Sequence, residues 1–198
     1  MAGKLRTFIA VPIPADILTR IREVQEAFAA YKFPVRWVRP ESIHLTLKFL
    51  GEIAEADLER VYDAMAASLQ IVRPLSLHAK GVGVFPTVKR PKVLWVGIGG
   101  ELESLKKIQA ELENNLEKIG FPKEKRPFNA HLTLGRVKGK IDSRKLAGAM
   151  REFSDFTTES FSAEEIVLFK SDLKPSGAVY TRLRTASLTE STDKSTDV

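Results

Sequence analysis

One tetrapeptide, His-Leu-Thr-Leu, occurs twice in the chain, at residues 44–47 and again at residues 131–134. Two of the three histidines in the sequence open these copies. The alternation of polar and apolar residues predicts that each copy is a β-strand with one buried face. Because residues i and i+2 of a strand point to the same side, each copy presents one imidazole and one hydroxyl together. If a pseudo-twofold axis relates the two halves, both pairs converge on one cleft.

The remaining sequence predicts amphipathic helices between paired strands. Apolar residues recur with helical spacing at 15–31, 55–69, 101–119 and 142–153. Besides the two repeat strands, we expect strands at 5–11, 75–85, 93–98, 160–170 and 178–186. Because these strands come in hairpins rather than alternating strictly with helices, the pattern favours an α+β fold over a doubly wound parallel sheet. The expected architecture is two pseudo-symmetric lobes, each a small, mostly antiparallel sheet backed by helices, with the active cleft between them.

Composition sets the remaining bounds. Residues 1–186 are expected to form one bilobal domain, and the Ser-, Thr- and Asp-rich residues 187–198 a disordered tail. The absence of cysteine excludes disulfides and thiolate metal sites. No apolar run suits a signal peptide or a membrane span, so we expect a cytoplasmic monomer with no membrane contact. The net charge of +6 favours a polyanionic partner.

The two histidine–threonine pairs suit chemistry on a phosphate ester. An imidazole can act as base or acid near neutral pH, and the residues alone leave open which histidine takes which role. The alternative to an enzyme is a catalytically inactive RNA-binding module, but binding alone would not require both imidazoles. A metal site is disfavoured, because no acidic residue lies at ligand spacing beside either copy, and no cofactor is expected. The third histidine, His78, has no such context, and we interpret it as structural.

Four stretches of the sequence carry a resemblance to a known family. They are HLTLKFLG at 44–51, GVFP at 83–86, VLWVG at 93–97 and RPFNAHLTLGR at 126–136. In this order they resemble the two-histidine (2H) phosphoesterase superfamily, and within it the RNA 2′,3′-cyclic phosphodiesterases, also called 2′-5′ RNA ligases or LigT-like proteins. The resemblance covers residues 5 to about 185. It departs at Ala130, where the family commonly has proline.

The resemblance implies an activity and a set of roles. The activity is metal-independent hydrolysis of a 2′,3′-cyclic phosphate at an RNA 3′ end to a 2′-phosphate. Reversible 2′-5′ ligation, another cyclic phosphate or a 2′-5′-linked substrate stay open as alternatives. In the implied site His44 is the proton donor and His131 is the proton acceptor. The implied phosphate-binding residues are Thr46, Thr133 and Arg136.

Two further expectations concern the surroundings of the site. Strict alternation would turn Arg136 away from His131, so a strand end or a bulge at Gly135 is required to re-aim it. Aromatic and basic residues in the flanking stretches are candidate RNA contacts through stacking and phosphate attraction. They are Phe49, Phe85, Lys89, Arg90, Lys92 and Phe128.

Overall fold

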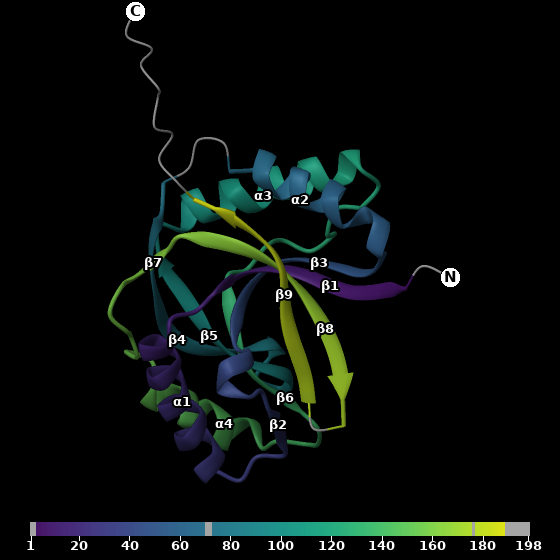
Figure 1. Ribbon diagram of the computed structural model, residues 1–198. Helices are drawn as coiled ribbons and strands as arrows, with labels where there is room; N and C mark the ends of the chain where they lie inside the picture. The colour runs from purple at the N-terminus through teal and green to yellow at the C-terminus, as the bar shows by residue number, and fades with distance from the viewer. Residues whose placement is uncertain (1–2, 70–72, 176, 189–198) are drawn as a thin grey trace, which may run out of the picture.

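The computed structural model describes residues 3–69, 73–175 and 177–188 and contains one curved sheet with helices at two ends (Figure 1). The strands are β1 (Lys4–Pro12), β2 (Val35–Trp37), β3 (His44–Ala54), β4 (Leu75–Thr87), β5 (Arg90–Gly100), β6 (His131–Val137), β7 (Phe161–Ala163), β8 (Glu165–Lys174) and β9 (Gly177–Ser187). The α-helices are α1 (Ala15–Ala30), α2 (Leu58–Ala67), α3 (Leu102–Lys118) and α4 (Ser143–Glu152). Short 3-10 turns, η1 (Pro40–Ser42) and η2 (Glu55–Asp57), precede β3 and α2.

The sheet has the order β7-β4-β5-β6-β3-β1-β8-β9, with β2 also paired to β6. This confirms the α+β class. The two expected half-sheets are joined where β3 meets β6, and the antiparallel register there pairs Leu45 with Leu132. The second residues of the two repeats therefore face each other at the centre of the sheet.

The leucines of both repeats point into the hydrophobic core, as the alternating pattern predicts. Leu45 and Leu132 are fully buried, and Leu47 and Leu134 are nearly so. Truncating a buried leucine to alanine typically costs about 2–5 kcal/mol, because it removes apolar contacts and leaves a cavity. The strands that carry the histidines are thus fixed from the core side.

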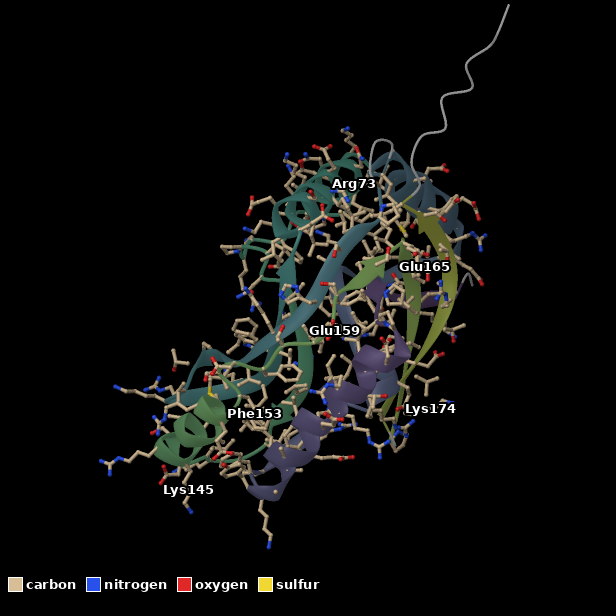
Figure 2. All side chains as sticks on the ribbon, turned by 90° about the vertical axis from the view of Figure 1, so that its left-hand side faces the viewer. Arg73, Lys145, Phe153, Glu159, Glu165 and Lys174 are labelled. Atoms are coloured by element: carbon tan, nitrogen blue, oxygen red, sulfur yellow. The ribbon has the colours of Figure 1, made fainter. Side chains whose placement is uncertain are left out.

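Helices α1 and α3 each contact a strand of the half-sheet that does not contain the strand preceding the helix. Helix α1 follows β1 but lies behind β6, where the Gln25 side chain donates to the carbonyls of Leu134 (2.8 Å) and Val38 (2.9 Å). Its end meets α4 through Phe28 and Phe153, whose ring centroids lie 5.3 Å apart. Figure 2 shows Phe153 between α4 and α1. Helix α3 follows β5 and spans the two halves, since it packs against both β3 and β4. These exchanges tie the halves together.

A buried ion pair anchors α3 to β3. The Lys48 ammonium bonds the Glu113 carboxylate and donates to the Pro122 carbonyl at 2.6 Å. The same carboxylate accepts from Gln109 and from the backbone N–H of Glu124. Because breaking a buried pair leaves an uncompensated charge, removing either partner is expected to cost about 3–5 kcal/mol.

The end of the described chain extends past the expected domain boundary. Strand β9 ends at Ser187, and Leu188 is buried with its N–H bonded to the Glu164 carbonyl at 2.7 Å. Residues 189–198 of the expected tail lie outside the described residues, so disorder there stays a prediction. Among the described residues, no helix is long and apolar enough to cross a membrane.

Candidate active site

The β3–β6 register brings both repeats into one cluster. Because Leu45 lies opposite Leu132 in an antiparallel pair, His44 lies opposite Thr133, and Thr46 lies opposite His131. Directly opposite side chains in such a pair have their Cβ atoms roughly 4.5–5.5 Å apart. The leucines occupy the core face, so both imidazoles and both hydroxyls share the other face.

Each imidazole is held by the same local hydrogen bond. His44 Nδ1 lies 2.8 Å from the Ser42 carbonyl oxygen, and His131 Nδ1 lies 2.7 Å from the Asn129 carbonyl oxygen. A carbonyl only accepts, so Nδ1 carries the proton in both rings. In the neutral form, Nε2 of each ring is then the unprotonated nitrogen, available to take up a proton.

The protein environment favours the neutral form of both histidines. Burial lowers the pKa of His44 to about 4; the Ser42 hydrogen bond opposes this shift, and the charge of His131 adds to it. Burial likewise lowers the pKa of His131, against its bond to Asn129, and the charge of Arg136 adds to the lowering. The influence of the His131 charge on the pKa of His44 agrees with the placement of the two histidines in one cluster.

Aromatic rings enclose His44. Phe8 stacks on its imidazole at 4.5 Å between centroids, and Tyr180 meets it edge-on at 5.2 Å. Phe169 lies 6.4 Å away and stacks on Phe8 at 5.3 Å. The sequence analysis did not identify these three rings, because β1, β8 and β9 carry no recognisable motif. The pairing of β1 with β3 and β8 brings Phe8 and Phe169 to His44, and the pairing of β8 with β9 adds Tyr180.

His131 lies between other aromatic rings, both from the β4–β5 hairpin. Phe85 meets its imidazole edge-on at 4.9 Å, and Trp95 lies 6.3 Å away. Phe85 is one of the candidate RNA contacts, and the structure places it directly at the imidazole. Trp95 is half-buried, and its ring contacts that of Phe85 at 5.1 Å.

A β-bulge re-aims Arg136, as the alternation argument required. Thr133 pairs with Trp95 and Gly135 with Leu94, so Leu134 is the extra residue on β6. Leu134 and Gly135 are consecutive buried positions, and Arg136 returns to the exposed face. Its charge acts on both His131 and Tyr180, which places it beside the cluster.

Gly135 is required for a second reason, which is the packing of the neighbouring strand β2. A Cβ there would lie 2.5 Å from Val35 Cγ1 and 3.1 Å from Trp37 Cε3, because β2 pairs with β6 at this position and its side chains lean over the glycine. A larger residue would displace β2 or straighten the bulge. The glycine therefore supports both the packing of β2 and the direction of Arg136.

The other candidate contacts divide into two groups. Phe49 is 62% exposed, and its ring lies 6.0 Å from that of Phe8, on the His44 side. The basic residues Lys89, Arg90 and Lys92 are exposed at the tip of the β4–β5 hairpin, which also carries Phe85. Phe128, in contrast, is partly buried against the hydrophobic core.

Neither His78 nor a metal site joins the cluster. His78 lies on β4, opposite Gly99 of β5, and its ring occupies the space above that glycine. Within residues 3–69, 73–175 and 177–188, no group of three or more His, Cys, Asp or Glu side chains is arranged to hold a metal ion.

An antiparallel two-lobed fold with a His-x-Thr strand from each half at its centre is the arrangement expected of a two-histidine phosphoesterase. The family model described as LigT-like phosphoesterase matches residues 11–95 and 97–180. The chain belongs to this family.

Several relatives share one name, RNA 2′,3′-cyclic phosphodiesterase. The protein of that name from Methanothermobacter thermautotrophicus is 33% identical over 178 residues, which cover 90% of this chain and 96% of the relative. The one from Thermotoga maritima is 31% identical over 176 residues, covering 89% and 91%. Among solved structures, a Thermus thermophilus protein superposes with a TM-score of 0.78 at 26% identity, covering 94% of this chain and all of that one. E. coli LigT complexed with 3′-AMP shares the fold, with a TM-score of 0.74 at 22% identity over 95% of this chain and all of that one.

Proposed function

We propose that the protein hydrolyses the 2′,3′-cyclic phosphate at an RNA 3′ end and leaves a 2′-phosphate. The observation that carries the proposal is the pair of imidazoles on neighbouring strands, each with Nδ1 bonded to a backbone carbonyl and Nε2 left for proton transfer. The names of the relatives support RNA as the substrate class. Because one chain supplies both histidines and both threonines, we also propose that a monomer is active, with the cytoplasm as its place of action.

The proposed reaction uses each side chain once. Nε2 of His131 takes a proton from water as the water oxygen attacks phosphorus. The bond from phosphorus to O3′ breaks, and Nε2–H of His44 gives its proton to O3′. Thr46 and Thr133 donate hydrogen bonds to the non-bridging oxygens, and Arg136 offsets the negative charge that grows on them. The cycle ends with His131 protonated and His44 neutral, so a proton must return through solvent.

The lowered pKa values imply that the bound substrate helps to keep the catalytic acid protonated. In the free protein both imidazoles are mostly neutral at pH 7, yet the proposed acid needs a proton. The negative charge of a bound cyclic phosphate stabilises an imidazolium beside it and so raises its pKa. Since kcat/KM reports the free enzyme, its optimum is expected between pH 4 and 6.5, on the acid side of an unperturbed histidine.

The test is to incubate an oligoribonucleotide ending in 2′,3′-cyclic phosphate with the protein and a chelator, and to identify the product end by phosphorus NMR. The proposal expects a 2′-phosphate from the wild type and unchanged substrate with His44→Asn or His131→Asn. A 3′-phosphate product would contradict the assigned leaving group. Activity lost on chelation and restored by a divalent ion would contradict the metal-free mechanism, and tight binding without turnover would favour the inactive RNA-binding module.

A further inference from the structure

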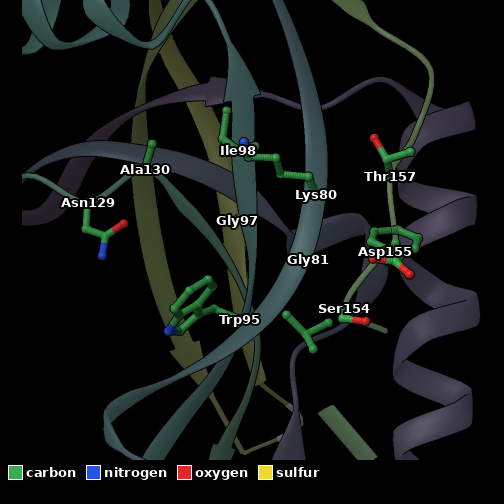
Figure 3. A pocket seen from close by; sticks show the side chains of 12 residues that line it. Lys80, Gly81, Trp95, Gly97, Ile98, Asn129, Ala130, Ser154, Asp155 and Thr157 are labelled. Carbon is green, nitrogen blue, oxygen red and sulfur yellow. The ribbon is translucent and has the colours of Figure 1, made fainter. Parts of the chain in front are cut away.

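A pocket of about 610 Å³ adjoins the His131 side of the site (Figure 3). Its floor comes from β4 and β5, and its walls come from residues 129–130 before β6 and from the segment 154–157. One wall is directly connected to the catalytic cluster, because the Asn129 carbonyl accepts the His131 Nδ1–H bond. None of the roles proposed above uses this pocket.

The sheet register aligns a lysine with the catalytic histidine across a glycine. Lys80 of β4 lies opposite Gly97 of β5, and Gly97 lies opposite His131 of β6. Residues directly opposite one another in neighbouring strands share a face of the sheet. Gly97 contributes no side chain, so the surface between Lys80 and His131 is backbone that the edge of the Trp95 ring partly covers.

The Lys80 side chain leans over Gly99 of β5, next to the His78 ring, rather than over Gly97. Its Cδ lies 3.0 Å from where a Cβ on Gly99 would be, so the side chain covers β5 rather than the outer edge of β4. Figure 3 shows Lys80 directed over β5, away from Asp155 on the far wall. Two strand spacings separate β4 from β6, roughly 10 Å. The stem of Lys80 already extends over β5, so a change of rotamer would carry its ammonium toward a phosphate next to one bound at His131.

The pocket also contains polar groups without partners. In the described part of the chain, the Lys80 ammonium takes part in no ion pair or hydrogen bond. The Trp95 Nε1–H, on the same floor, is buried with no acceptor. Because Trp95 Nε1 has almost no accessible surface, a ligand in the pocket does not reach it. The exposed Lys80 ammonium is the group on this floor that can pair with a nucleotide phosphate.

We propose that this pocket binds the nucleotide immediately 5′ of the cyclic phosphate, with Lys80 paired to its phosphodiester. The inference rests on the proposed function and deepens it. RNA with a cyclic phosphate at its 3′ end continues only in the 5′ direction, so a substrate longer than one nucleotide needs such a path. The His44 side offers the exposed ring of Phe49 and the half-buried ring of Tyr180 instead, which suit stacking of the terminal base, with the buried ring of Phe8 packed between them.

The test compares three substrates with wild type and Lys80→Met, a substitution that keeps the apolar stem and removes the charge. The substrates are a 2′,3′-cyclic mononucleotide, a dinucleotide with the same cyclic end, and that dinucleotide with a neutral methylphosphonate linkage. The charge-matched control is Lys107→Met, on an exposed position of α3 behind the sheet. Thermal unfolding of each variant checks that the fold is kept.

Lys80→Met is expected to lower kcat/KM for the charged dinucleotide by about five- to twentyfold, as for a lost charge-assisted contact. The effect on the mononucleotide and on the methylphosphonate should be much smaller, and Lys107→Met should match the wild type on all three. An equal loss of kcat/KM on the mononucleotide would place the terminal nucleotide in the pocket and overturn the proposed subsite but not the proposed function. An unchanged kcat/KM for the charged dinucleotide would do the same. A wild-type protein that turns over none of the three would overturn the proposed function, and the subsite with it.

Discussion

The half-site around His44 and the half-site around His131 share one backbone plan. Both begin with an imidazole whose Nδ1 bonds the carbonyl two residues earlier. Both contain a bulge after the threonine, since Leu47 on β3 and Leu134 on β6 are each the extra residue in their pairing. The bulges make Phe49 the counterpart of Arg136, because each is the exposed residue five positions after its histidine.

The surroundings of the two half-sites differ in chemistry. The His44 half is lined by aromatic rings, with Phe49 where the other half has an arginine. The His131 half has Arg136, the Lys80 pocket and a floor of glycines. The comparison shows that the backbone supplies two equivalent proton-transfer positions. The neighbouring side chains then specialise one half for stacking and the other for negative charge.

The largest effect is expected from removing either imidazole. His44→Asn and His131→Asn should each lower kcat/KM by about 10²- to 10⁴-fold, since each loses one proton-transfer group. The double variant should be little worse than either single variant, because the two residues act as a unit. Single-turnover rates on an RNA cyclic phosphate measure this. If His78→Asn is as damaging as these variants, the equivalence of the two half-sites is wrong.

The second prediction concerns stability. A histidine with a pKa of about 4 when folded and 6.5 when unfolded destabilises the fold as pH falls through that interval, since the unfolded chain binds the proton more readily. Between pH 7.5 and 4.5 the His44 contribution is about 2 to 3 kcal/mol. Urea unfolding should therefore show that His44→Asn loses that much less stability than the wild type. His131→Asn should reduce this acid-induced loss of stability by a smaller amount. An equal reduction would contradict the difference between the two environments.

The third prediction compares the two counterpart positions. Arg136→Met should lower kcat/KM by about ten- to a hundredfold through the loss of transition-state charge stabilisation. Phe49→Ala should mainly raise KM, by about fivefold, through the loss of base stacking. Steady-state kinetics separate the two outcomes. A fall in kcat with Phe49→Ala but not with Arg136→Met would reverse the proposed specialisation.

The smallest effect is expected at the tip of the β4–β5 hairpin. Lys89→Ala, like Arg90→Ala or Lys92→Ala, should raise KM for a long RNA by about two- to threefold at low salt, because each removes one phosphate contact at most. The effect should shrink as salt is added. KM values measured at two salt concentrations check this, and an effect that is the same on a cyclic mononucleotide would argue against an RNA path over the hairpin.

Much of the site could be predicted because its frame is local in sequence. The alternation in His-Leu-Thr-Leu predicts which side chains share a face, and the same rule showed that Arg136 needs a bulge. The rings of Phe8, Phe169 and Tyr180 could not be predicted, since they reach His44 through strand pairings far apart in the chain. The role of Lys80 could not be predicted for the same reason. Its relation to His131 depends on the register of three strands, which single residues do not reveal.

The position of β1 between β3 and β8 has a consequence for the order in which the protein matures. Strand β1 pairs on one side with β3, which follows it closely in the sequence, but its other side waits for β8, which is synthesised much later. Until then β1 is an open sheet edge, which can pair with other chains. Phe169 and Tyr180 arrive equally late, so a nascent chain carries both histidines well before His44 acquires its enclosing rings. Pairings this distant fold slowly, and completion of the active site is therefore expected to follow the synthesis of β8 and β9.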